Sequence, residues 1–177
     1  MSTERFFVLT GAPGSGKSAL LKHLRTLGFQ GIAEPARQIL SEQRSIAGNG
    51  LPGRDSRLFV ELMLSRMIGE YHRMASPAAP VFFDRGIPDT LGYASHFGFD
   101  YPQGQNASRQ YRYNRLVFYA PAWEQIYTPD EERTLSFQAA SRFGEDLRAV
   151  YQQSGYTLID LPCLSVEERA GFILDLL

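Results

Sequence analysis

A glycine-rich stretch near the N-terminus, TGAPGSGKS at residues 10–18, constrains the fold of this chain more than any other feature. It follows the apolar run Phe6–Leu9 and precedes Lys17–Leu27, in which leucines recur at helical spacing. The pattern G-x-x-x-x-G-K-[ST] is filled by Gly11, Gly16, Lys17 and Ser18. Glycines let successive backbone N–H groups turn toward an oxyanion, and the helix adds its positive end. The stretch therefore predicts a phosphate-binding loop between a buried strand and a helix.

The whole loop is a candidate nucleotide-binding element. Its residues are Gly11, Ala12, Pro13, Gly14, Ser15, Gly16, Lys17 and Ser18. In such a loop the lysine reaches the β- and γ-phosphates, and the hydroxyl after it is offered to Mg²⁺. Lys17 and Ser18 are thus expected to act on ATP and on Mg²⁺. The alternative is a glycine-rich turn that carries an exposed lysine.

Short apolar runs alternate with helical patterns along the whole chain. The expected strands are Arg5–Leu9, Phe29–Ala33, Ala79–Asp84, Arg115–Tyr119 and Tyr156–Leu161. Helices are expected after each of them, with a further, largely buried one over Leu58–Tyr71. This order predicts a three-layer α/β fold, a five-stranded parallel sheet flanked by helices. We expect residues 1–177 to form one domain.

Composition and charge narrow the range of partners. The chain has eighteen Lys and Arg residues and nineteen Asp and Glu residues, which gives a net charge of -1. The broad positive electrostatic potential of a nucleic-acid-binding protein is therefore not expected. The single cysteine, Cys163, is expected to be a buried apolar residue. No run of about 18 apolar residues and no signal-like N-terminus is found, so the expected location is cytoplasmic, without membrane contact.

Asp84 ends the predicted strand Ala79–Asp84. A carboxylate at the carboxyl end of such a strand can hold a magnesium-bound water beside Ser18. The alternative for Asp84 is an N-cap of the following helix.

The loop sequence GAPGSGK resembles that of the adenylate-kinase-like and nucleoside-kinase-like branch of the P-loop NTPase fold. The overall layout is also similar to a family of small AAA-like ATPase domains that includes the kinase domain of nicotinamide riboside kinase. The resemblance covers essentially the whole chain, and its one specific motif is the loop. It implies a Mg-ATP-dependent phosphotransferase that acts on a small molecule, such as a nucleoside, a nucleotide or a related hydroxyl compound.

The resemblance also implies roles for two charged residues. The sequence DRG at 84–86 resembles the Asp-Arg or Glu-Arg-Ser signature of nucleoside kinases. In that signature the arginine contacts the substrate or phosphoryl oxygens. Arg85 corresponds to this arginine, and Gly86 replaces the serine. Glu34, followed by proline, resembles the carboxylate that nucleoside kinases extend toward the acceptor hydroxyl. The alternatives are that Arg85 is an ordinary surface arginine and that Glu34 is an acid at a helix N-terminus, where the helix dipole favours a negative charge. Arg37, one turn further, could face the same cleft or pair with Glu34.

The segment 120–134 is too long and too polar for a tight connection, and it is the candidate lid. In kinases of this type an arginine of the lid reaches the transferred phosphate, which makes Arg133 the candidate, with Arg142 as a possible second arginine. Three neighbouring acids, residues 130–132, could instead make Arg133 a structural ion-pair partner.

Three functions remain open from the sequence. The leading hypothesis is the small-molecule kinase, with Lys17, Glu34, Asp84, Arg85 and Arg133 as catalytic residues and with Ser18 and Asp84 at the metal. The second is a regulatory ATP-binding protein or ATPase that acts through a protein partner. The third, a kinase directed at nucleic acid, is disfavoured by the net charge. The oligomeric state is not encoded in any pattern that we identify.

Overall fold

The computed structural model describes residues 3–74, 77–128 and 135–177, and it contains one sheet of five parallel strands in the order β2-β3-β1-β4-β5. The strands are β1 (Phe6–Gly11), β2 (Gln30–Ile32), β3 (Val81–Asp84), β4 (Leu116–Ala120) and β5 (Thr157–Asp160). The α-helices are α1 (Lys17–Thr26), α2 (Ala36–Ser45), α3 (Ser56–Arg73), α4 (Asp89–His96), α5 (Pro102–Gln110), α6 (Phe137–Gln153) and α7 (Val166–Leu174), and the short 3-10 helices are η1 (Thr3–Arg5) and η2 (Glu124–Ile126). The predicted α/β fold with a five-stranded parallel sheet is confirmed.

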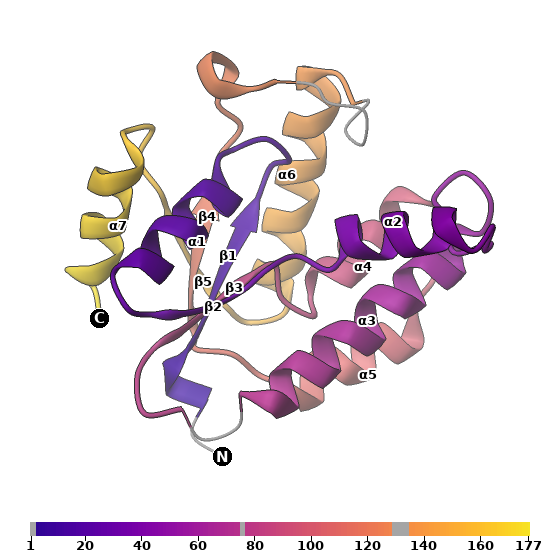
Figure 1. Ribbon diagram of the computed structural model, residues 1–177, viewed down its shortest axis with the longest axis horizontal. Helices are drawn as coiled ribbons and strands as arrows, with labels where there is room; N and C mark the ends of the chain where they lie inside the picture. The colour runs from indigo at the N-terminus through magenta and orange to yellow at the C-terminus, as the bar shows by residue number, and fades with distance from the viewer. Residues whose placement is uncertain (1–2, 75–76, 129–134) are drawn as a thin grey trace.

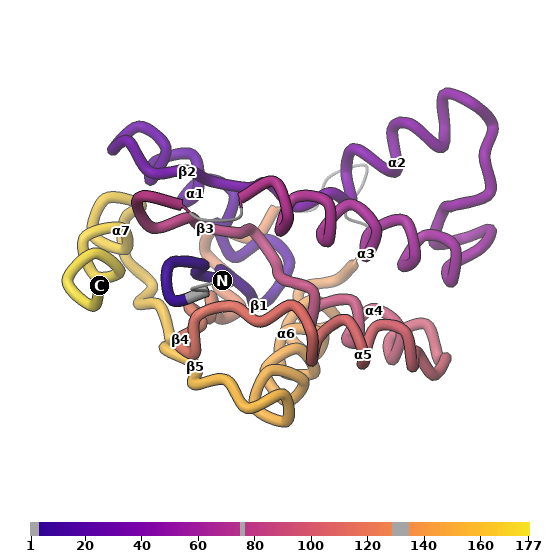
Figure 2. The backbone as a smooth tube through the Cα atoms, turned by 90° about the horizontal axis from the view of Figure 1, so that it is seen from below, coloured from indigo at the N-terminus to yellow at the C-terminus, as the bar shows by residue number. Residues whose placement is uncertain are grey.

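Helices cover both faces of the sheet, which explains the continuous apolar character of its central strands. In β1, Phe6 and Val8 belong to one core cluster, whereas Phe7 and Leu9 belong to the other. Side chains alternate between the faces of a strand, so a strand covered on both sides must be apolar throughout. Figure 1 shows α1 and α7 on one side of the sheet and α6 on the other side. The helices α2 to α5 lie on the side of α6 and extend away from the sheet. Figure 2 shows the same separation from below.

The parallel register brings the carboxyl ends of three strands to one edge. Leu9 of β1 is paired with Asp84 of β3, and Gly11 of β1 is paired with Ala120 of β4. The loop after β1, the acid that ends β3 and the segment after β4 therefore begin at the same edge of the sheet. In parallel α/β sheets this is the edge at which ligands bind.

The longest described helix, α3, begins with a side-chain cap and packs one apolar face on the core. Asp55 accepts a hydrogen bond from the backbone N–H of Leu58 (2.9 Å), which satisfies one of the donors left open at a helix N-terminus. Its buried residues, among them Phe59 and Met63, lie in the core cluster that also receives β1 and β3. Within the described part of the chain, no helix is both long enough and apolar enough to cross a membrane.

One local prediction is wrong, and it concerns a residue that follows β5 in the chain. Cys163 is exposed, because Leu161 is the last inward-facing residue after β5 and Cys163 lies beyond it in the loop before α7.

The close approach of β1 and β4 makes Gly11 a sensitive position. Gly11 has φ +120°, and a Cβ atom there would lie 2.1 Å from the carbonyl oxygen of Ala120. We expect Gly11→Ala to lower the free energy of unfolding by about 2 to 4 kcal/mol, because both backbone strain and steric overlap are introduced. Gly171→Ala is the matched control: no atom lies within 4 Å of its Cβ position, and alanine in α7 should stabilise by about 0.5 to 1 kcal/mol. Urea unfolding without ligand measures the free energy of unfolding of both variants. Equal stability of the two variants would contradict the claim that the close approach of β1 and β4 requires glycine at position 11.

Candidate active site

The loop between β1 and α1 has the backbone conformation that its glycines allow. Gly14 and Gly16 have φ of +77° and +81°, values that other residues adopt at a cost. α1 begins directly after Gly16, and Lys17 is its first residue. The Lys17 ammonium folds back and donates hydrogen bonds to the carbonyl oxygen of Ala12 (2.6 Å), to that of Gly11 (3.2 Å) and to the Ser15 hydroxyl (3.2 Å). The loop is thus closed around its own lysine.

Lys17 is a buried cation in a site of mixed charge. Burial, reinforced by the positive charge of Arg85, lowers its pKa to about 7, although the carboxylates of Asp84 and Glu34 oppose the shift. A phosphate group beside Lys17 would favour the charged ammonium.

Ser18 and Asp84, the two metal ligands predicted from the sequence, lie next to each other. The Ser18 hydroxyl donates a hydrogen bond to Asp84 Oδ2 (2.8 Å). Asp84 Oδ1 is buried and has no hydrogen-bond partner among the described residues. Burial and the nearby charge of Glu34 raise the pKa of Asp84, whereas Lys17, Arg85 and the Ser18 hydrogen bond lower it. A hydroxyl beside a carboxylate with one unused oxygen is a donor set that fits Mg²⁺. Asp84 does not cap α4, which begins five residues later.

Arg85 is a buried guanidinium held by two carboxylates. Its Nε donates to Glu34 Oε1 (2.7 Å) and its Nη1 to Asp89 Oδ1 (2.9 Å), while Nη1 also reaches the carbonyl oxygen of Gly11 (3.3 Å). Burial alone would lower its pKa, but Glu34 and the other neighbouring acids raise it well above the usual value. Arg85 is also one of two described non-glycine residues with positive φ, at 70°. The surface-arginine alternative is wrong, because Arg85 is 4% exposed.

Asp89, at the start of α4, was not singled out from the sequence, although it anchors this part of the site. It is fully buried and accepts four hydrogen bonds, from the Thr10 hydroxyl (2.8 Å), Arg85 Nη1 (2.9 Å), the Gly86 backbone N–H (2.9 Å) and the Tyr151 hydroxyl (2.6 Å). A buried carboxylate is stable only when such donors satisfy it. Asp89 therefore joins β1, the segment after β3 and α6 around Arg85.

Glu34 lies two residues beyond β2 and is held by two donors on the same oxygen. Arg85 Nε and the Tyr93 hydroxyl (2.9 Å) both donate to Glu34 Oε1, and no described residue donates to Oε2. Burial disfavours the charged carboxylate, but Arg85, Lys17 and the hydrogen bond from Tyr93 outweigh it, so the pKa of Glu34 lies below its usual value. Tyr93 was also missed by sequence reasoning, since nothing in the local pattern of α4 distinguishes it.

These groups line one large cleft of about 1390 Å³. Its phosphate-loop side includes Gly14 to Ser18, and its other walls carry Glu34, Arg85, Trp123 and Arg169. A cluster of aromatic rings lies beside Glu34, made of Phe59, Tyr93, His96, Phe97 and Phe143. The cleft thus joins a phosphate-loop region to an aromatic wall, with Glu34 and Arg85 between them.

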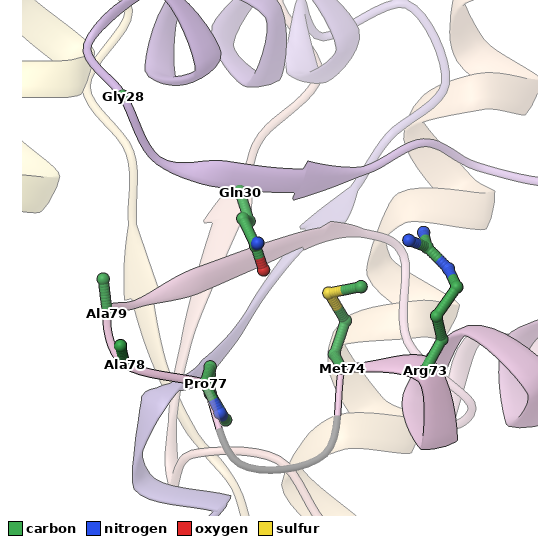
Figure 3. Close-up of a pocket in the computed structure, with 7 residues that line it drawn as sticks. All are labelled: Gly28, Gln30, Arg73, Met74, Pro77, Ala78 and Ala79. Atoms are coloured by element: carbon green, nitrogen blue, oxygen red, sulfur yellow. The ribbon is translucent and has the colours of Figure 1, made fainter.

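A second cavity, of about 380 Å³, lies at the opposite end of the sheet (Figure 3). Gln30, which begins β2, and Ala79, which precedes β3, both line it, so it sits at the amino ends of the strands. Among the described residues its one charged lining group is Arg73, which is paired with Glu70. No acid or nucleophile is found among the described residues that line it, and we assign it no function.

The remaining predicted residues are only partly placed. Arg133 and residues 129–132 and 134 of the candidate lid lie outside the described residues. The described part of the segment contains η2, whose Ile126 lines the cleft together with the neighbouring Trp123. Arg37 also lines the cleft, whereas Arg142 is exposed on α6.

The chain has a parallel sheet, and the glycine-rich loop after β1 closes around the lysine that begins α1. These two features define a P-loop domain, and its fold is that of small-molecule kinases. Similar structures include the NadR protein in complex with NR (TM-score 0.69, 19% identity, 98% of this chain and 50% of that chain). Deoxyadenosine kinase from M. mycoides is also similar, with a TM-score of 0.63 and 16% identity over 96% of this chain and 97% of that chain. Thymidylate kinase from Ehrlichia chaffeensis has a TM-score of 0.64 and 16% identity over 98% of this chain and 97% of that chain. The chain thus spans half the length of the NadR chain that it matches.

The AAA domain family matches residues 6–169, and the chain belongs to this family. No curated protein matches it. At these low identities the similarity to solved structures defines the fold alone, so the activity must be inferred from the site.

Proposed function

We propose that the protein is a Mg-ATP-dependent kinase that transfers the γ-phosphate to a hydroxyl group of a small molecule. The observation that carries this proposal is the state of Glu34. One of its oxygens is fixed by Arg85 and Tyr93, while the other receives no hydrogen bond from the described residues. An ionised carboxylate with one oxygen held and one available, in the cleft that the phosphate loop lines, suits a general base.

The residues of the loop supply the binding site for the triphosphate. In this proposal the backbone N–H groups of residues 14–18 bind phosphate oxygens, and Lys17 exchanges its contacts with Ala12, Gly11 and Ser15 for contacts with the β- and γ-phosphates. Ser18 and Asp84 hold Mg²⁺, which would neutralise part of the phosphate charge.

Transfer is written as an in-line displacement at the γ-phosphorus. The acceptor oxygen forms the new bond to phosphorus, its proton passes to Glu34 Oε2, and the bond between the γ-phosphorus and the bridging oxygen breaks to release ADP. Arg85 keeps Glu34 ionised and brings a positive charge to the cleft. Arg133 of the candidate lid is proposed to neutralise charge on the transferred group, as the sequence predicted.

The wall beside Glu34 favours an acceptor that contains a planar ring. Flat aromatic side chains bind rings by offset or edge-on contacts, and four of the five rings in this wall belong to phenylalanine or tyrosine. Nucleosides and nucleotides combine such a ring with a hydroxyl group, so we propose them as the first acceptors to test.

Incubation of the protein with Mg-ATP and pooled nucleosides, nucleotides or sugars tests the proposal directly. We expect acceptor-dependent ADP release in at least one pool, and loss of that release in Lys17→Ala because the phosphates lose their lysine. Slow ADP release that no pool changes would contradict the kinase proposal and support the regulatory ATPase. Circular dichroism of Lys17→Ala checks that the variant is folded.

Nucleotide binding is expected to depend on pH through Lys17. Its pKa is about 7 without ligand, and phosphate oxygens must raise it, so binding takes up a proton above pH 7. The ADP dissociation constant should therefore rise with pH between about 7.5 and 9, by at most about tenfold per unit. Calorimetry in buffers of different ionisation enthalpy measures the uptake. The Lys17→Met variant should lack it, and an identical pH slope in that variant would refute the linkage.

Removal of the Tyr93 hydroxyl tests its role in positioning Glu34. In Tyr93→Phe we expect kcat to fall about tenfold, with little change in ADP affinity, because one of the two donors to Oε1 is lost. The same hydrogen bond lowers the pKa of Glu34, so the acidic limb of kcat/KM should move to higher pH. Tyr101→Phe is a matched control, since Tyr101 is also buried and its hydroxyl makes no hydrogen bond with the described residues. An unchanged pH profile in Tyr93→Phe would show a structural role only.

A further inference from the structure

Arg169 is a buried cation at the back of the phosphate loop. It lies in the second turn of α7, whose N-terminus is fixed by a capping box between Ser165 and Glu168. Its neighbour Ala170 packs into the core shared with α1, which lies beside α7 in Figure 1. The Arg169 side chain instead reaches the loop, where Nη1 donates a hydrogen bond to the carbonyl oxygen of Ser15 (3.0 Å).

The charge of Arg169 is not compensated within the described chain. The residue is 2% exposed, its Nε–H is buried without a hydrogen-bond partner, and no ion pair links it to a described carboxylate. Arg85, the other buried arginine of the cleft, is held by two carboxylates. Burying a charge and a donor without partners costs free energy, so such a group in a native fold points to a partner that binds from outside the chain.

The surroundings of Arg169 indicate where that partner lies. Arg169 lines the large cleft together with Trp123, Ile126, Leu164 and Val166. A Cβ atom on Gly16 would lie 2.9 Å from Arg169 Nη1 and 3.2 Å from Ile126, so Gly16 is bordered by both side chains. This end of the cleft therefore combines apolar side chains with the Arg169 guanidinium and Ser165, and it adjoins the end of the phosphate loop.

We infer that Arg169 is a nucleotide-binding residue, whose Nε–H donates to an acceptor atom of the bound nucleotide while Nη1 holds the Ser15 carbonyl. The inference rests on the nucleotide site of the proposed function but not on phosphate transfer. An oxygen of a phosphate group and an acceptor atom of the base or ribose share the required chemistry. α7 would thus support the loop and contact the ligand through one side chain.

Calorimetric titration with Mg-ADP tests the assignment. We expect the dissociation constant to increase at least about tenfold in Arg169→Met, since a hydrogen bond from a charged donor is lost. Arg115→Met, which removes an exposed arginine at the amino end of β4, should bind as the wild type does. Thermal unfolding checks both variants. If Arg169→Met does not fold, Arg169→Gln replaces it with the same expectation.

A second titrant, inorganic tripolyphosphate with Mg²⁺, separates the two kinds of acceptor. Equal loss of affinity for ADP and tripolyphosphate in the variant assigns the contact to a phosphate, whereas loss for ADP alone assigns it to the base or ribose. ADP affinity within twofold of the wild type in a folded Arg169 variant would overturn the inference, as would a wild-type protein that binds no ADP. A wild type that binds ADP but phosphorylates no acceptor would refute the kinase proposal and leave this inference standing.

Discussion

The charged side chain of Arg85 is the contact on which the site depends most. It joins the carboxylate beyond β2, the acid at the start of α4 and the carbonyl oxygen of Gly11 at the end of β1. A buried guanidinium is tolerated only when such partners surround it, and removal of one partner typically costs several kcal/mol. The positive φ of Arg85 fits this picture, since an unfavourable backbone conformation persists where the surrounding contacts determine it.

The same arrangement gives neighbouring acids different protonation tendencies. Glu34 contacts Arg85 directly, so its pKa falls below the usual value in spite of burial. Asp84 is buried and lies near the negative charge of Glu34, so its pKa rises, although the hydrogen bond from the Ser18 hydroxyl opposes the shift. A proton acceptor must be ionised, and an acid whose charge is poorly compensated gains most from a bound cation. The two shifts therefore agree with the separate roles that we propose for Glu34 and Asp84.

Sequence patterns were sufficient for the sheet, the phosphate loop and the position of Asp84, because each depends on local spacing. The contacts of Asp89, Tyr93 and Arg169 could not be read in this way. Tyr93 contacts an acid 59 positions earlier in the chain, and Arg169 contacts a carbonyl 154 positions earlier. Cys163 shows the reverse case, in which a residue type that is usually buried lies outside the core because the strand before it has already ended.

The sequence by itself determined the alternation of strands and helices and the position of the glycine-rich loop, since strand and helix periodicity and glycine freedom are properties of short segments. Only the tertiary structure decided which carboxylates meet Arg85, which oxygen of Glu34 remains available and which arginine lies buried behind the loop. Those features depend on the parallel register and on the packing of α4 and α7 against the sheet edge, where groups distant in the chain come within hydrogen-bond distance.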